Sequence, residues 1–355
     1  MATEKTASKT GKPLTLDTEH LVQDILSVIE RDREREIVSR RYGLFDRKET
    51  LEQIGELLGI TRERVRQLEK SVVAKLKELT EQGKLTPAKK IEAALTDYLE
   101  QNGGAGRVAD ISAAITTENS RTDQSRVAFL AALCPGLVII EDDDHHFLAI
   151  GCAKKRDMRT MKEAISNLVT SIKKHGKPLT ISEVAKLAKI AEEAEVKALA
   201  SISKKLATLN DQWGLVKWPV VNPKNIRDKI YVILQQHGNH MHFNDIAAAI
   251  KQSDFKRKNV TTQAIHNELI KDKRFVLIGR GLYALTEWGF KKGTVADIIT
   301  EVLREAGEPL HRDEIVKRVL KSRYVKETTI LLNLQGKTQF KRVAKATYEL
   351  VIDEQ

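Results

Sequence analysis

The fold of this chain is decided by residues 50–69, which read TLEQIGELLGITRERVRQLE. Thr50 and Gln53 have the spacing of a capping box, which predicts the start of a helix. Gly59 suits the left-handed position that ends such a helix, and Thr61 can cap a second helix. Two helices joined by a short glycine turn form a helix-turn-helix, so this stretch predicts that motif.

Four polar side chains lie near the start of the second predicted helix. Arg62 and Arg66 can each bond a guanine through two donors, while Gln67 can bond adenine and Glu63 can accept from cytosine. The alternative is a solvated helix face on which these charges pair with one another.

The flanking sequence extends the pattern on both sides. Residues 33–45 read REREIVSRRYGLF, and residues 75–77 read KLK. Together with residues 50–69, these segments resemble region 4 of the primary bacterial sigma factors, from about Asp32 to Leu79. In that family the module is C-terminal and follows regions that melt the promoter. Here it lies near the N-terminus, so we do not expect a complete sigma factor.

The resemblance implies a module that recognises the −35 promoter element and docks on the β-flap of RNA polymerase. Carried over position by position, it places the DNA base contacts at Arg62, Glu63, Arg66 and Gln67. It also places Thr50, Arg64 and Lys75 near phosphates or partner proteins.

Composition narrows the function classes. The 355 residues include 60 Lys and Arg against 49 Asp and Glu, and two cysteines. Residues 151–222 and 223–292 each carry a net charge of +7, whereas residues 81–150 carry −5. This distribution favours a segmented protein with nucleic acid among its partners. We expect a cytoplasmic, nucleoid-associated protein with no membrane segment, no metal and no cofactor.

After about residue 87 a pattern of three helices and a β-rich pair recurs four times, which is the plan of a winged helix. The predicted fold class is therefore mainly α, with a sigma-region-4-like helix-turn-helix followed by tandem winged-helix modules. The predicted domains are a disordered lead (1–16), the helix-turn-helix module (17–82) and winged modules at 87–152, 158–222, 223–290 and 293–352.

The third repeat carries a resemblance of its own. Its segments MHFNDIA (241–247), TTQAIHNEL (261–269) and FVLIGRGLYALTEW (275–288) resemble the HARE-type winged helix, a family that includes the amino-terminal domain of the RNA polymerase delta subunit. The resemblance implies DNA binding or attachment to polymerase. The predicted DNA backbone or partner contacts are Lys256, Arg257, Lys258, Thr261, Thr262, Gln263, His266 and Arg280, the last in a glycine turn suited to a narrow minor groove.

The first two repeats differ in charge. The hairpin of the first repeat holds the acidic run Glu141–Asp144, which would repel phosphate, so we expect it to face protein or to be idle. The second repeat is basic at residues 154–156 and 173–174, which could reinforce non-specific DNA contact.

The sequence therefore predicts a DNA-binding bacterial transcription factor that reads promoter-like duplex DNA and docks on RNA polymerase. The alternative is a delta-like polymerase accessory that acts mainly through protein–protein contacts. A third reading, a nuclease, has little support because no nucleophile–base set, phosphate-binding loop or paired metal ligands occur. We expect no enzymatic activity.

Overall fold

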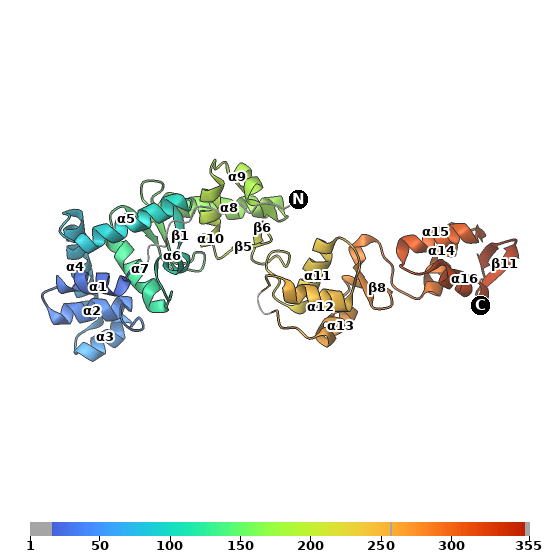
Figure 1. Cartoon of the computed structure of the whole chain (residues 1–355), viewed down its shortest axis with the longest axis horizontal. Coiled ribbons are helices and arrows are strands. Elements are labelled where there is room, and N and C mark those ends of the chain that lie inside the picture. Colours follow the sequence, from blue (N-terminus) through green and yellow to red (C-terminus); the bar gives the residue numbers. More distant parts are fainter. Residues whose placement is uncertain (1–15, 256–257, 352–355) are drawn as a thin grey trace, which may run out of the picture. The chain divides into compact units, whose positions relative to one another are not determined.

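The computed structural model describes residues 16–255 and 258–351. The chain folds as two compact units that divide after Lys217 (Figure 1). Both are mainly helical with small three-stranded sheets, so the predicted fold class is confirmed. The predicted lead lies outside the described residues except for Leu16, whose N–H donates to the carbonyl of Ile115 at 2.8 Å.

The first unit begins with four helices: α1 (Thr18–Ser27), α2 (Asp32–Tyr42), α3 (Leu51–Leu58) and α4 (Arg62–Glu81). Ile37, Ile54 and Val65 form a small core between α2, α3 and α4. Each lies on the apolar face that its helix turns toward the other two. This core holds α3 and α4 as the predicted helix-turn-helix.

Four repeats with one order of elements follow. The first contains α5 (Thr86–Gln101), β1 (Ala105–Arg107), α6 (Val108–Ile115), α7 (Arg121–Leu133), β2 (Leu137–Ile140) and β3 (Ala149–Cys152). The second contains α8 (Met158–His175), β4 (Leu179–Thr180), α9 (Ile181–Ala188), α10 (Glu193–Ile202), β5 (Leu206–Leu209) and β6 (Gln212–Leu215).

The second unit holds the other two repeats. The third contains α11 (Ile226–His237), β7 (Met241–His242), α12 (Phe243–Gln252), α13 (Thr262–Lys271), β8 (Phe275–Gly279), β9 (Leu282–Leu285) and the short 3₁₀-helix η1 (Thr286–Trp288). The fourth contains α14 (Val295–Ala306), β10 (Leu310–His311), α15 (Arg312–Ser322), α16 (Glu327–Gly336), β11 (Phe340–Ala344) and β12 (Thr347–Leu350).

The sheets repeat as closely as the helices. In every repeat the last strand lies in the middle, antiparallel to the short first strand and to its hairpin partner. One further backbone hydrogen bond joins the two strands of each hairpin at the end opposite the loop. The residue after the last strand donates its N–H to the carbonyl of the residue before the preceding strand. This bond joins Ala153 to Gly136, Val216 to Lys205, Thr286 to Arg274 and Val351 to Gln339, at 2.8–2.9 Å.

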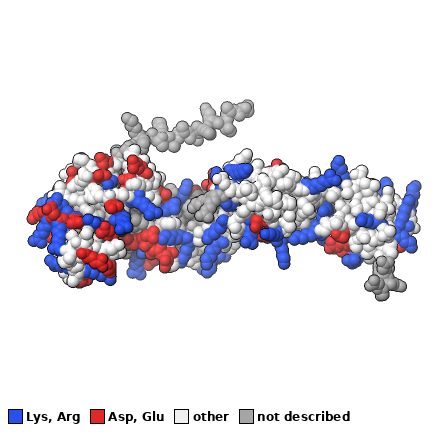
Figure 2. Space-filling view, turned by 90° about the horizontal axis from the view of Figure 1, so that it is seen from below, with Lys and Arg blue, Asp and Glu red and all other residues white. Residues whose placement is uncertain are grey.

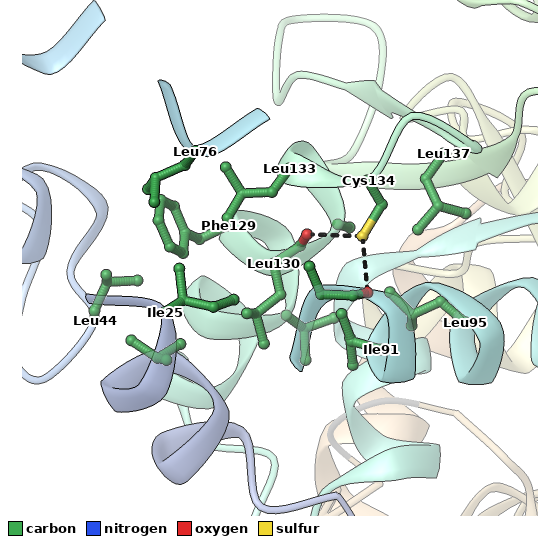
Figure 3. Close-up of a cluster of buried hydrophobic side chains, with 14 of the residues drawn as sticks. Ile25, Leu44, Leu76, Ile91, Leu95, Phe129, Leu130, Leu133, Cys134 and Leu137 are labelled. Carbon is green, nitrogen blue, oxygen red and sulfur yellow. Dashed lines mark hydrogen bonds between the residues drawn. The ribbon is translucent and has the colours of Figure 1, made fainter. Parts of the chain in front are cut away.

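The helix-turn-helix and the first repeat share one hydrophobic core. Side chains of α1, α4, α5 and α7 meet there, among them Ile25, Leu76, Ile91 and Phe129 (Figure 3). The segments 17–82 and 87–152, which we expected to be separate domains, are thus joined by packing. α7 makes this possible because its second half, residues 127–133 (VAFLAAL), is apolar on all sides, which suits a helix covered by several neighbours.

A buried cysteine and a buried arginine reinforce this core. The Cys134 Sγ–H donates to the Leu130 carbonyl at 3.2 Å, and burial raises the pKa of its thiol to about 12. Arg126 is 8% exposed and donates from Nε to the Leu44 carbonyl at 2.7 Å. It also pairs with Glu19 of α1 at 2.6 Å, so α7 holds both α1 and the end of α2.

The second repeat packs against the first. Its helix α10 lies on β1, and Arg156 pairs with Glu195 at 2.6 Å. The acidic hairpin loop of the first repeat contacts the second repeat, where Lys204 Nζ donates to Asp142 Oδ1 at 2.7 Å. Of the two outcomes expected for this loop, facing protein or being idle, the structure therefore shows the first, and the protein is the chain's own second repeat.

Candidate nucleic-acid interface

The turn between α3 and α4 is set by caps that the sequence already indicates. The Gln53 N–H donates to Thr50 Oγ1 at 3.2 Å, and the Thr50 N–H donates to Gln53 Oε1 at 2.9 Å, which completes the capping box. Gly59 ends α3 at φ +62°, a conformation that favours glycine. Thr61 caps α4 through its side-chain oxygen. These local bonds fix the direction in which α4 leaves the turn.

The four predicted base-contact residues lie exposed on the first two turns of α4. The side chains of Arg62, Glu63 and Arg66 are 68%, 57% and 52% exposed, and Gln67 is also exposed. Arg66 donates to both carboxylate oxygens of Glu63, at 2.8 and 2.6 Å, and Arg62 pairs with Glu52 at 2.8 Å. Without a ligand, these charged side chains therefore form hydrogen bonds and ion pairs with neighbouring side chains.

These pairings shift the titration of the two partners. The hydrogen bond from Arg66 is the main cause that lowers the pKa of Glu63, and the same bond raises the pKa of Arg66. Both groups thus keep their charge at neutral pH. Figure 2 shows acidic and basic side chains next to one another over the part of the molecule that holds α1–α4. Such exposed pairs are worth about 0–1 kcal/mol each, so a ligand can displace them.

The predicted backbone contacts of this module occupy different places. Thr50 and Arg64 are exposed beside the turn, and Arg64 Nη1 donates to Gln67 Oε1 at 3.4 Å. Lys75 lies about 20 Å further along α4 than Arg62, at 1.5 Å per residue. Its Nζ is 3.9 Å from Glu30 Oε1. Lys75 therefore does not share the surface formed by the start of the helix.

Three cationic side chains near the turn were not among the contacts predicted from the sequence. Lys70 follows Arg66 by one helical turn, so the two side chains share a face of α4. Arg47 and Lys48 are exposed in the loop that leads into α3. No salt bridge to any of the three occurs among the described residues. The i, i+4 spacing from Arg66 was the signal that would have found Lys70.

The third repeat exposes part of its predicted contact set. Lys258, Thr261, Gln263 and Arg280 are exposed, whereas Thr262 is half-buried. Lys256 and Arg257 lie outside the described residues.

His266 has a second role besides any contact with a ligand. It is half-buried, and its ring stacks edge-on against Phe243 at 5.2 Å and Tyr283 at 6.2 Å between ring centroids. The ring therefore also packs α13 against the start of α12 and against β9.

The third helices of the first two repeats are covered by other parts of the first unit. α7 packs against α1, α2, α4 and α5, and α10 packs against β1. Two cations that the sequence suggested for DNA contact, Lys155 and Arg156, instead pair with Glu192 and Glu195. The start of α4, in contrast, exposes a face with four polar side chains.

Neither a metal cluster nor a membrane span is found in the described segments. No group of three or more His, Cys, Asp or Glu side chains within residues 16–255 and 258–351 could hold a metal ion. No helix over the same residues is long and apolar enough to cross a bilayer.

Comparison with known proteins places the first module in a family. Residues 31–78 match the family Sigma-70, region 4. The chain is 44% identical over 62 residues to an RNA polymerase sigma factor, sigB, of Arabidopsis thaliana, which is 17% of this chain and 11% of the relative. It is 46% identical over 57 residues to RNA polymerase sigma factor SigA1 of Synechococcus elongatus, which is 16% of this chain and 14% of the relative. The chain thus covers less than a sixth of either relative. Residues 31–78 thus match the sigma-70 region 4 family, as the resemblance in the sequence indicated.

Proposed function

We propose that this protein binds duplex DNA in bacterial transcription, with the start of α4 in the major groove. The single observation that carries the proposal is the exposure of Arg62, Glu63, Arg66 and Gln67 together on one face of that helix. To reach bases, Arg66 must leave Glu63, and an exposed ion pair of this kind contributes little to stability. A bidentate contact with a base contributes about 1–3 kcal/mol of discrimination against the wrong base.

The surroundings of the turn support the same orientation. In this proposal the exposed residues around the turn, Thr50, Arg64, Arg47 and Lys48, contact the phosphate backbone of the duplex. Phosphate contacts of this kind fix the register of a helix-turn-helix on DNA without reading sequence. Lys75 would then contact a partner protein rather than DNA, because it lies three to four turns from the turn region.

The third repeat is the second DNA contact in this proposal. Its helix α13 exposes Gln263 and Asn267, and the turn between β8 and β9 exposes Arg280. We propose a HARE-type winged helix in which Lys258 and Thr261 bind phosphates at the start of α13. Arg280 would then enter the minor groove, where a narrow groove attracts arginine.

Docking on RNA polymerase is the remaining part of the proposal. Both relatives named above are RNA polymerase sigma factors by name. A specific observation also favours the alternative of a delta-like accessory that works through protein contacts. Two of the four repeats use their third helix for packing inside the first unit, which leaves fewer surfaces for DNA.

Selection of bound sequences from a random duplex pool, with and without RNA polymerase, tests these readings. Enrichment of a common site by the protein alone supports reading by α4, and Arg66→Ala with Gln67→Ala should abolish the enrichment. Lys77→Ala is the matched control, because Lys77 is exposed on the same helix beyond the reading turns. Binding to polymerase with no enrichment of any duplex would refute DNA reading and support the accessory role.

A further inference from the structure

The second repeat contains a copy of the reading helix-turn-helix. Thr180 and Glu183 form a capping box at the start of α9, as Thr50 and Gln53 do at the start of α3. Both first helices end at a left-handed residue, with φ +57° and ψ +39° in the second repeat and φ +62° and ψ +39° in the first module. The two motifs therefore share the geometry of the first helix and its turn.

The same backbone bond closes both turns. It joins the Ile60 N–H to the Gly55 carbonyl at 2.9 Å and the Ile190 N–H to the Ala185 carbonyl at 3.1 Å. In each case the bond ties the residue after the left-handed position back to the middle of the first helix. The equivalence thus rests on hydrogen bonding as well as on sequence spacing.

In the copy, the start of the second helix packs against the first repeat through its backbone, while Glu193 and Lys197 remain exposed. A side chain at Gly103 would place its Cβ 2.2 Å from the Ala194 carbonyl oxygen, so the start of α10 lies directly against the first repeat. Glu192 and Glu195 pair there with Lys155 and Arg156. The second helix of this motif consequently serves as an internal contact.

One exposed position of the first helix carries the opposite charge in the copy. α3 exposes Glu56, whereas α9 exposes Lys186 at the equivalent position. Lys189 occupies the left-handed position that Gly59 fills in the first module. An L-residue is disfavoured in that conformation. A lysine kept where glycine would be unstrained is therefore a candidate for a functional role rather than a packing one.

Three more lysines continue this basic surface. Lys173 and Lys174 end α8, and Lys177 lies in the turn that leads to β4 and α9. All are exposed, as are Lys186 and Lys189, and none forms a salt bridge with a described residue. The favourable interaction of cations with a helix C-terminus explains Lys173 and Lys174, but it does not explain Lys177.

The two parts of the surface are close in space. α8 and α9 pack against each other. The pKa of Glu183 is lowered mainly by hydrogen bonds from Thr180, with further contributions from the nearby charges of His175 and Lys186. Glu183, in the first turn of α9, is therefore near both the end of α8 and Lys186, and its carboxylate also accepts the capping-box hydrogen bonds.

We propose that Lys173, Lys174, Lys177, Lys186 and Lys189 form a basic corner that binds the phosphate backbone of duplex DNA without reading its sequence. The inference rests on the proposed function for the identity of the ligand. The basic corner lies in the same compact unit as α4, so this unit would carry both a reading helix and a sequence-independent contact. Repeated phosphates of a duplex match a row of flexible lysines, which require no fixed geometry.

The test is the salt dependence of binding by the full chain, measured by fluorescence anisotropy on the selected duplex and on a scrambled one. The variant combines Lys177→Gln, Lys186→Gln and Lys189→Gly, which keeps the left-handed turn. The matched control combines Lys84→Gln, Lys89→Gln and Lys90→Gln, three exposed lysines around the start of α5 without salt bridges to described residues. Thermal unfolding verifies that both variants fold.

The basic-corner variant should reduce the slope of log K against log salt by about 2 to 3, at about 0.9 per phosphate contact, equally on both duplexes. The control should change the slope on neither. An unchanged slope in the basic-corner variant, while the wild type still binds its preferred site, overturns the inference and leaves the proposed function standing. If the wild type binds in a salt-dependent way but prefers no site, base reading by α4 is refuted and the inference about the basic corner is not. If it binds neither duplex, both proposals are refuted.

Discussion

Phe129 connects the stability of the helix-turn-helix to that of the first repeat. It belongs to α7, is 1% exposed, and its ring centroid lies 4.9 Å from that of Tyr42 in α2. Phe129→Ala should cost about 3–5 kcal/mol for the buried ring and the cavity it leaves. Loss of the aromatic pair accounts for about 0.5–1.5 kcal/mol of that range. Since about 1.4 kcal/mol corresponds to a factor of ten, a loss of stability near 4 kcal/mol raises the equilibrium constant for local opening roughly a thousandfold.

Hydrogen exchange resolved along the full chain measures this effect. We expect backbone amides of α2 and α4 to exchange faster in Phe129→Ala by two to three orders of magnitude, because local opening exposes amides in proportion to the lost stability. Phe340→Ala is the control, since Phe340 is 6% exposed in the core of the fourth repeat. It should accelerate exchange there and leave α2 and α4 unchanged. If Phe129→Ala accelerates only α5–α7, the helix-turn-helix is stable on its own and the shared core does not support it.

Three further outcomes are expected. Arg66→Ala should reduce discrimination between the selected site and its single-base variants by about 1–3 kcal/mol in competition binding; unchanged discrimination would show that Arg66 contacts no base. Lys189→Gly should raise the Tm of the first unit by roughly 2 °C, because glycine removes the cost of a left-handed L-residue, and a lower Tm would contradict this. The side-chain hydrogen bond with His146 is the main cause that holds the pKa of Asp143 below its ordinary value. The contribution of this hydrogen bond to the stability of the fold is therefore present above the pKa of about 3.9 that Asp has in the unfolded chain. It is lost as the pH falls through the lower pKa of Asp143 in the folded chain. An NMR titration of the carboxyl group with a midpoint at or above about 3.9 would contradict that sign.

Much of the candidate site could be predicted because its signals are local. The capping box at Thr50, the glycine at Gly59 and the cap at Thr61 act within a few residues, so their spacing carries the geometry with it. The exposure of Arg66 followed from the same helical period that buries Val65. The same helical period would also have predicted Lys70 as a member of the exposed face.

The roles of the repeats could not be predicted in the same way. Lys155 and Arg156 look like free cations in the sequence, yet they pair with carboxylates 37 and 39 residues away. The acidic loop at Asp142 was expected to face protein or to be idle, and only the structure shows that it binds Lys204 of the second repeat. A salt bridge between distant segments depends on how two repeats dock, and no local period encodes that arrangement.

Short-range chemistry alone determined where the helices begin and end, that three helices and a hairpin recur, and which helix carries the side chains proposed to read bases. Long-range packing alone decided which of those helices remain open to a partner. α7 and α10 have the same place in their repeats as α13, but α7 packs against α1 and α4 and α10 packs against β1. The physical reason is that caps and periodicity act over a few residues, whereas the free energy of burying an apolar face depends on surfaces that only the folded chain brings together.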